Sequence, residues 1–251
     1  VSAVTSVTGT HAELMSLYAA GTAGTITGLG NEAITANDAG ISVSQANDLA
    51  AKTTGALTAT LSNTALADYA TLEGTGNAYA IQIADAAIDA DALQALNAKT
   101  TVNIDLTGDT SISGTLANVN AVVAETGITN VLDTIAVTIT DTITAAQAET
   151  LVGTNVGNVT ATIAADAAAT INGALTAAAD GNDNFSITVT DTAGVASVLN
   201  TLDSRTATDI DVSSLISVTG ANADIVTLYG NTANFVGLGN ENITPTDANL
   251  T

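Results

Sequence analysis

Acidic residues that follow predicted strands are the first candidates for a functional site in this sequence. Asp85, Asp141 and Asp191 come two residues after the last inward-facing apolar residue of a segment, and Asp109 and Asp166 come three residues after it. Because carboxylates repeated along one edge repel each other, a hard divalent cation with oxygen ligands, such as calcium, would stabilise them. The alternative is that they form Asx turns or cap the helix that follows, which short polar side chains also favour. The pattern thus leaves both a calcium ladder and a set of helix caps open.

Threonine pairs at alternate positions of the predicted strands are the second candidates. Residues two apart in a strand face the same side, so each T-x-T pair places two hydroxyls on one face. A regular hydroxyl array could bind a flat or repetitive surface such as a glycan or ice, although threonine is also simply a good strand residue that tolerates solvent. Amides and acids occupy the equivalent places in other strands, which weakens the ice hypothesis most. The candidate surface-binding residues are Thr58, Thr60, Thr138, Thr140, Thr160, Thr162, Thr188 and Thr190.

Other residue patterns argue against an enzyme. Cysteine is absent and His11 is the only histidine, so thiolate or imidazole metal sites and a Ser-His-Asp triad are not expected. Gly28–Ala33 fits the GxGxxA dinucleotide fingerprint, but its copy at Gly237–Asn242 ends in asparagine, and we interpret both as turns. The acids that face outward on strands lie several units apart, farther than the ~5–10 Å that paired catalytic carboxylates need. We therefore expect no catalytic residue and no cofactor other than calcium.

The charge balance narrows the range of partners. The chain has 25 acidic and three basic residues, a formal net charge of -22, yet 46% of its residues are hydrophobic, so its composition is compatible with folding. Nucleic acids and anionic membranes are bound through lysine and arginine, so neither is an expected partner. No apolar stretch reaches the ~18 residues that span a bilayer, so no membrane insertion is expected.

Short segments that alternate apolar and small polar residues must position these side chains. Capping boxes that would begin a helix between two such segments are found at Ser42–Gln45 and Thr144–Gln147. The segment centres lie mostly about 23 residues apart, which is too long for hairpins and suits a helical crossover between parallel strands. The interval from Asp109 to Asp133 is longer and holds either a longer helix or a degenerate extra unit. The predicted strands are residues 57–61, 79–83, 102–106, 135–139, 159–163, 185–189 and 210–212.

A strand and a short helix in every unit of about 23 residues predict the fold class. We expect an α/β protein in which residues 1–251 form a single continuous solenoid of ~23-residue strand–helix units around one parallel β-sheet. The architecture is like that of leucine-rich repeats, but the LxxLxLxxN consensus is missing, so that family is not implied. Small alanine and threonine side chains would let neighbouring units, here called rungs, stack closely.

A longer repeat encloses the short one. VSAVTSVTG at residues 1–9 matches VSSLISVTG at residues 212–220, and GLGNEAIT at 28–35 matches GLGNENIT at 237–244. We interpret residues 1–211 as one long repeat and residues 212–251 as the start of the next copy. The pattern predicts that the parent protein continues in tandem.

Two units carry a resemblance to a known class of protein. ITAAQAETLVGTNVGNVTATIAAD (143–166) and ISVSQANDLAAKTTGALTATLSN (41–63) resemble the tandem Ala/Thr-rich repeats of giant secreted cell-surface proteins, of S-layer or adhesin type, from marine cyanobacteria and other aquatic bacteria. The resemblance lies in composition and rhythm and carries no catalytic motif. It implies an extracellular, calcium-rich setting and a structural or adhesive role.

Two functions follow as hypotheses. The first is an extracellular structural protein that stacks end to end with further copies of the same repeat into a filament, stalk or surface layer, with calcium as a stabilising ion. The second is an adhesin or glycan-binding module that uses the outward threonine face. Changing Thr160 and Thr162 would matter most in the second case, and changing the strand-end acids would matter most in the first.

Overall fold

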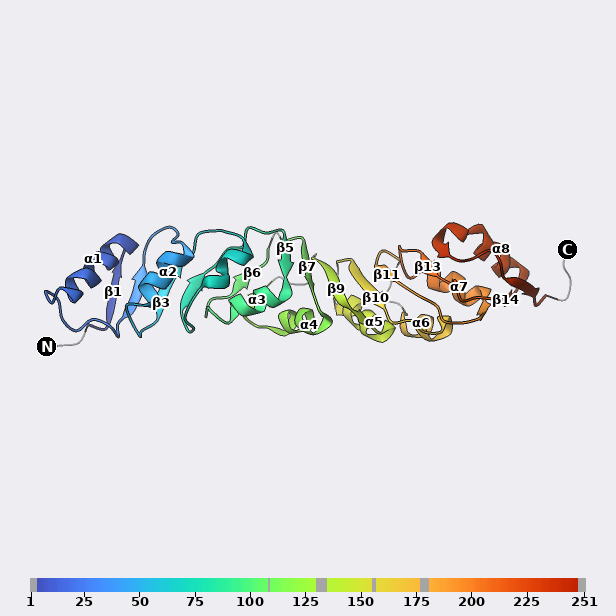
Figure 1. Cartoon of the computed structure of the whole chain (residues 1–251), viewed down its shortest axis with the longest axis horizontal. Coiled ribbons are helices and arrows are strands. Elements are labelled where there is room, and N and C mark those ends of the chain that lie inside the picture. The colour runs from blue at the N-terminus through green and yellow to red at the C-terminus, as the bar shows by residue number, and fades with distance from the viewer. Residues whose placement is uncertain (1–3, 108, 130–134, 155–156, 177–180, 248–251) are drawn as a thin grey trace. The chain divides into compact units, whose positions relative to one another are not determined.

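The computed structural model describes residues 4–107, 109–129, 135–154, 157–176 and 181–247. The chain divides into two compact units. Unit 1 contains Val1–Thr110 and Ala117–Val131, and unit 2 contains Ser111–Leu116 and Leu132–Thr251. Both units are built from short strands that alternate with short helices (Figure 1).

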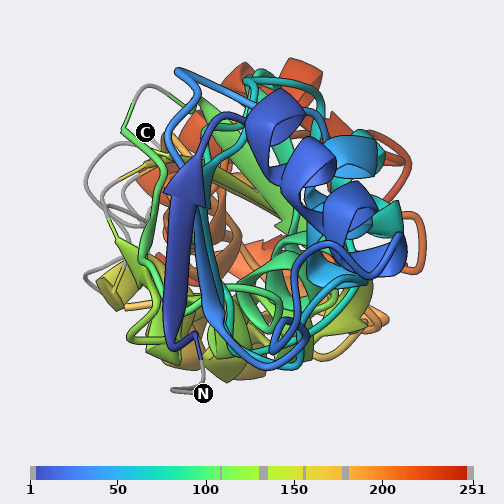
Figure 2. The ribbon, with the colours of Figure 1, turned by 90° about the vertical axis from the view of Figure 1, so that its left-hand side faces the viewer.

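Unit 1 begins with a strand followed directly by a helix, and Figure 2 shows β1 on one side of this first rung and α1 on the other. Its elements are β1 (Ser6–Gly9), α1 (His11–Thr22), β2 (Ala33–Ala36), α2 (Val43–Ala50), β3 (Leu57–Thr60), the 3-10 helix η1 (Leu66–Thr71), β4 (Ala78–Ala80), β5 (Ala87–Asp89), α3 (Ala90–Asn97), β6 (Ile104–Asp105), β8 (Ile128–Thr129) and most of α4 (Leu116–Ala124).

Unit 2 repeats the same alternation. Its elements are β7 (Ser111–Gly114), β9 (Ala136–Ile143), α5 (Ala145–Thr154), β10 (Val159–Ile163), α6 (Ala168–Ala174), β11 (Asn184–Ser186), β12 (Ala193–Val195), α7 (Ala196–Asp203), β13 (Ile210–Asp211), β14 (Ser217–Gly220), α8 (Asn222–Gly230), the 3-10 helix η2 (Thr232–Asn234), β15 (Phe235–Val236) and β16 (Asn242–Pro245).

The prediction of parallel strands joined by helical crossovers is confirmed, because every strand pairing in the described part of the chain is parallel. The prediction of one sheet is wrong. In unit 1 the strands form the order β1-β2-β3-β4 and a separate β6-β8 pair, and in unit 2 they form β11-β10-β9-β7, β12-β14-β16 and β13-β15. The sheets are separate because one rung carries two short strand segments, such as β13 and β14, and each pairs with its own partner in the next rung.

The long interval after Asp109 contains an extra rung. The nine-residue helix α4 lies there between strands β7 and β8. β6 pairs directly with β8, and β7 pairs with β9, so this rung has the same construction as its neighbours. Asp133, which marked the end of the interval in the sequence, lies outside the described residues.

In each unit the core consists mainly of small and branched apolar side chains. Strand residues alternate between buried and exposed, as in β10, where Val159, Ala161 and Ile163 are buried. Helices contribute a narrow stripe in which alanine lets the helix lie close to the strands, as Ala46 and Leu49 do in α2. Both predicted capping boxes are present and begin α2 and α5.

Two glycines fix how closely successive rungs approach. A Cβ atom at Gly55 would lie 2.3 Å from the carbonyl oxygen of Glu32, and one at Gly157 would lie 2.2 Å from the carbonyl oxygen of Ile135. Each glycine lies two residues before a buried strand residue, Leu57 or Val159. The two units therefore use the same backbone contact at the same place in their rungs.

Candidate functional site

Five aspartates accept a hydrogen bond from the first residue of a helix that lies one rung earlier in the chain. We call these contacts the inter-rung caps. The carboxylate accepts from the backbone N–H at 2.5–2.8 Å in four of them, and a fifth joins Asn222 to Asp247. The four measured pairs are His11–Asp38 at 2.7 Å, Leu66–Asp85 at 2.5 Å, Leu116–Asp141 at 2.8 Å and Ala168–Asp191 at 2.6 Å.

For η1, α6 and α8 the inter-rung caps supply what the local sequence lacks, whereas α1 also has a capping box of its own at Thr10. The residues that immediately precede η1, α6 and α8 are Ala65, Ala167 and Ala221, and none of them makes a side-chain capping bond. The first N–H groups of a helix have no partner within it and carry the positive end of its dipole, so a carboxylate is the best partner for them. The next rung delivers that carboxylate.

The caps fall on every second helix. The helices α1, η1, α4, α6 and α8 receive an inter-rung cap. Of the helices between them, α2, α3 and α5 are capped by their own Ser42, Asp89 and Thr144, and α7 has no side-chain capping bond. The structural repeat is therefore two rungs long. Each capping aspartate is the fifth residue of a short sequence pattern, in which the first residue is Ile or Val, the second is Thr or Gln, and the third and fourth vary. It occurs at 34–38, 81–85, 137–141, 187–191 and 243–247.

The sequence interpretation of these acids needs correction. Asp85, Asp141 and Asp191 cap the helix of the preceding rung, and not the helix that follows as the capping hypothesis supposed. Sequence reasoning missed Asp38 and Asp247 as members of the set, although both follow the same five-residue pattern. The direction was missed because a capping residue is normally sought immediately before its helix, and here it lies 19 to 27 residues after it.

Asp109 and Asp166 are held differently. Asp166 accepts from the adjacent N–H of Ala167 at 2.7 Å. Burial raises the pKa of Asp109, and the nearby carboxylates of Asp105 and Asp85 raise it further. Unit 2 contains three of the predicted calcium ligands, Asp141, Asp166 and Asp191, and unit 1 contains the other two, Asp85 and Asp109. Among the residues that the structure describes, no group of three or more His, Cys, Asp or Glu side chains could hold a metal ion.

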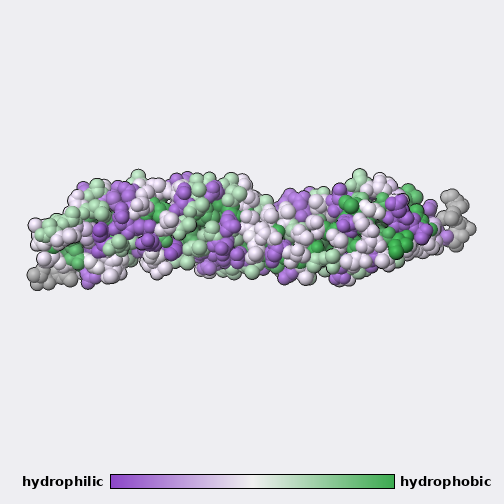
Figure 3. All heavy atoms as spheres, viewed as in Figure 1, coloured by the Kyte–Doolittle hydropathy of each residue, from purple (hydrophilic) through white to green (hydrophobic). Residues whose placement is uncertain are grey.

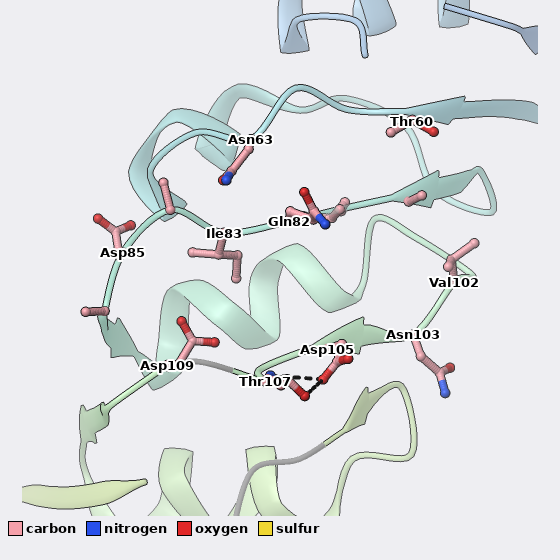
Figure 4. A pocket seen from close by; sticks show the side chains of 14 residues that line it. Thr60, Asn63, Gln82, Ile83, Asp85, Val102, Asn103, Asp105, Thr107 and Asp109 are labelled. Carbon is pink, nitrogen blue, oxygen red and sulfur yellow. Dashed lines mark hydrogen bonds between the residues drawn. The ribbon is translucent and has the colours of Figure 1, made fainter. Parts of the chain in front are cut away.

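A polar groove in unit 1 is lined by three aspartates, two of which are predicted calcium ligands. It has a volume of about 630 Å³, and Asp85, Asp105 and Asp109 line it together with amide side chains that include Asn63 and Gln82. Figure 4 shows Asp109 lying between the loop that carries Asp85 and the strand that carries Asp105. Asp105 also accepts hydrogen bonds from the backbone N–H and the hydroxyl of Thr107 at 2.9 and 2.8 Å. The groove is therefore anionic and lined by oxygen ligands.

A second set of polar contacts joins helices of neighbouring rungs. Asn47 of α2 donates to the carbonyl oxygen of Thr71 at 2.8 Å and accepts from the N–H of Glu73 at 2.9 Å, so it braces the end of η1. Glu149 of α5 accepts from the N–H of Thr176 at 3.0 Å just after α6. In these contacts a helix side chain binds the backbone of the following rung, whereas in an inter-rung cap the aspartate binds the backbone of the preceding rung.

All eight candidate threonines are exposed and alternate with buried residues, as predicted. They do not form one continuous face. Thr58 and Thr60 lie on β3 in unit 1, where their next partners along the sheet are Ala78 and Ala80. The other six lie in unit 2.

The polar row in unit 2 is the more regular one. Thr138 pairs with Thr160, which pairs with Asn184, and the amide of Asn184 lies 3.5 Å from the Thr160 hydroxyl. An irregularity in β9 places Thr142 opposite Thr162, where the two-residue alternation of the sequence would have placed Thr140. Thr188 lies beside Asp211 at the end of this region, and Thr190 follows it.

The repeated GLGNE segments are turns, each locked by a tyrosine. The Tyr18 hydroxyl donates to the Glu32 carboxylate, which also accepts from the N–H groups of Gly30 and Asn31 at 2.6 and 3.1 Å. Burial acts to raise the pKa of Glu32, but these hydrogen bonds together hold it below its ordinary value. In the second copy Tyr229 donates to Glu241 at 2.8 Å, and burial followed by that carboxylate raises the pKa of Tyr229 to about 12. Backbone N–H groups of each GLGNE segment donate to the carboxylate of the segment's own glutamate, so this geometry gives no support to a cofactor role for the motif.

The visible face of the chain carries mostly hydrophilic and neutral residues, with small hydrophobic areas that include some in the C-terminal part of unit 2 (Figure 3). No helix among the described residues is long and apolar enough to cross a membrane. Comparison of the chain with protein-family models, curated proteins and solved structures gave no match.

Proposed function

We propose that this chain is a non-enzymatic structural repeat of an extracellular surface protein, whose rungs continue as a solenoid from one repeat copy into the next. The observation that carries the proposal is the set of inter-rung caps. The first N–H of each of these five helices takes its acceptor from the rung after it, and η1, α6 and α8 make no side-chain capping bond of their own, so their ends are completed by the neighbouring rung. Such nearest-neighbour dependence is the physical basis of a repeat array.

The chemistry of the surface supports the same role. The net charge of -22 keeps a long array soluble and separates neighbouring arrays, and it disfavours polyanionic partners. We propose that calcium acts in the groove beside Asp105 and Asp109 by screening carboxylate repulsion, which adds to burial in raising the pKa of Asp109. The described carboxylates form no preformed metal-binding group, so the ion acts there by screening. The inter-rung cap carboxylates already have donors and are not proposed as the calcium ligands.

A tandem chain tests the proposal. Residues 39–251 are joined directly after Asp247, because that residue is the copy of Asp38 in the long repeat. If rungs stack across the junction, the Ile243 amide becomes protected from hydrogen exchange, and the tandem chain unfolds at a higher urea concentration than the single chain. If the two copies unfold independently at the midpoint of the single chain, the proposal is wrong.

The second candidate function is a surface-binding module, favoured by the polar row of Thr138, Thr160 and Asn184 in unit 2. A pull-down on insoluble polysaccharides tests it. The double variant Thr160→Val, Thr162→Val should lose binding, and Thr58→Val, Thr60→Val in unit 1 serves as the matched control. Equal retention of the wild type and both variants would exclude the row as the binding surface.

A further inference from the structure

Three amide side chains of the groove in unit 1 have no part in holding the fold together. Asn63, Gln82 and Asn103 are exposed and line the groove, and their amide groups form no hydrogen bond with any described residue. Asn47 and Asn77 of the same unit, by contrast, bind backbone groups of neighbouring rungs. Figure 4 shows Asn63 and Gln82 pointing into the space between the segments that carry them. The groove amides are therefore available to a ligand.

Unit 2 contains a counterpart of this region, 106 residues later in the sequence. Asp191 caps a helix there as Asp85 does in unit 1, and Asp211 of β13 accepts from the N–H two residues later, as Asp105 of β6 does. The side chains at the groove nevertheless differ between the units. Gln82, Val102, Asn103 and Asp109 have the counterparts Thr188, Thr208, Asp209 and Leu215. The fold therefore does not dictate the groove side chains of unit 1.

Asp109 is the clearest departure from its counterpart. Leu215 is 8% exposed, and a Cβ atom at Gly194 would lie 3.2 Å from its methyl groups. Unit 1 has the buried Ile88 at the position of Gly194, so Ile88 takes the interior volume that Leu215 fills in unit 2. Asp109 lies at the groove instead, half-buried, and its carboxylate accepts no hydrogen bond from a described group. Because a half-buried carboxylate without a donor is costly, a ligand that donates to it would be favoured.

The mixture of groups in the groove selects the class of ligand. The carboxylates of Asp85, Asp105 and Asp109 only accept hydrogen bonds, whereas the three amides both donate and accept. Metal ions and ammonium groups offer no acceptor to the amide N–H groups, but the hydroxyls of a sugar donate and accept. The exposed Val102 and the half-buried Ile83 can contact the C–H face of a sugar ring. An anionic sugar would be repelled by the three carboxylates.

We propose that the groove binds a short segment of a neutral oligosaccharide, with Asn63, Gln82 and Asn103 hydrogen-bonded to its hydroxyls and Asp109 accepting from them. The volume of about 630 Å³ is within the range of small-ligand sites. This function is separate from the array and from the polar row of unit 2. If copies are joined as in the proposed function, each copy presents one such groove, and a long polysaccharide is bound at several points at once.

Nuclear magnetic resonance of the ¹⁵N-labelled full chain tests the proposal, because side-chain amides give their own signals. The neutral probes are cellotriose, maltotriose and tri-N-acetylchitotriose, the anionic probe is trigalacturonate, and a chelator is present throughout. At least one neutral probe should shift the amide signals of Asn63, Gln82 and Asn103 together. The signals of Asn47 and Asn77 should stay in place as an internal control, and trigalacturonate should shift none of these signals.

Two variants and a matched control locate the site. Asn103→Ala should raise the Kd for the bound probe by roughly fivefold, the value of one hydrogen bond, and Asp109→Leu by about tenfold or more, because its carboxylate is charged. Asp109→Leu introduces the residue that the counterpart position carries, so its circular dichroism spectrum should be retained. Asp209→Ala, the exposed counterpart of Asn103 in unit 2, should leave the Kd unchanged.

Four outcomes would overturn the proposal. They are the absence of shifts with all three neutral probes, equal binding of trigalacturonate, a Kd that neither groove variant changes, and shifts of the same amides by calcium chloride but by no sugar. Each of them would leave the proposed array standing, because that function is decided by unfolding of the tandem chain.

Discussion

Removing one inter-rung cap should destabilise the helix of the preceding rung by a defined amount. Asp191 is the clearest case, because Ala167 before α6 makes no side-chain capping bond and the 2.6 Å bond from Ala168 to Asp191 takes its place. Loss of a helix cap costs about 1 kcal/mol, and loss of a carboxylate from the positive end of the helix dipole costs a further ~0.3–1 kcal/mol. We expect Asp191→Ala to lower the free energy of unfolding by about 1–2 kcal/mol, and Asp191→Asn by less than half of that.

Two measurements check this expectation. Urea unfolding followed by circular dichroism gives the free energy, and a thermal midpoint lower by about 2–8 °C should accompany it. Hydrogen exchange at the Ala168 amide reports the bond itself, and exchange there should quicken in Asp191→Ala. The control is Asp48→Ala, which removes an exposed acid on α2 that caps no described helix. The reasoning is refuted if Asp191→Ala and Asp48→Ala are equally stable and exchange at Ala168 is unchanged.

Three further perturbations follow from the structure. Gly157→Ala forces a Cβ to within 2.2 Å of the Ile135 carbonyl oxygen and should cost about 1–3 kcal/mol in urea unfolding, whereas Gly173→Ala, with open space around it, should not destabilise. The pKa of Glu32 is lower in the folded state than in the unfolded state, so the stability that Glu32 contributes is complete above the unfolded pKa and is lost as pH falls through the folded pKa. When unfolding is measured as a function of pH, the Glu32→Gln variant should therefore lose less stability in acid than the wild type does. Calcium should raise the midpoint of thermal unfolding more than sodium does at matched ionic strength, and the Asp109→Asn variant should lose most of that difference. Equal midpoints in the two salts would show that calcium does not act at the groove.

The alternation of apolar and polar residues predicted much of the fold. Segments such as 57–61 and 159–163 are strands because valine, leucine and threonine at period two suit a half-buried strand, and the capping boxes at Ser42 and Thr144 mark real helix starts. Short strands such as β7, β12 and β14 were missed, because so few residues carry little periodicity, and β13 (Ile210–Asp211) is shorter than the predicted segment 210–212. The number of sheets depends on which of these pair, and pairing is a tertiary property.

The candidate site was predictable in composition but not in geometry. The sequence identifies Asp85, Asp141 and Asp191 as regular, strand-end acids, and any such acid can cap a helix or bind a cation. Only the spatial stacking of rungs decides that their partners are the N–H groups of Leu66, Leu116 and Ala168 in the rung before. The groove around Asp109 could not be predicted either, because it depends on how two rungs lie beside each other.

The direction of the inter-rung caps has a consequence for how the chain is made. In each of the five, the helix that needs the acceptor precedes the aspartate that provides it. A chain emerging from the ribosome therefore exposes each capped helix before its acceptor has been synthesised. The boundary between finished and unfinished structure must trail synthesis by about one rung, and it advances in one direction only. A premature stop between one of these helices and its aspartate would leave that helix without its inter-rung cap at the end of the truncated product.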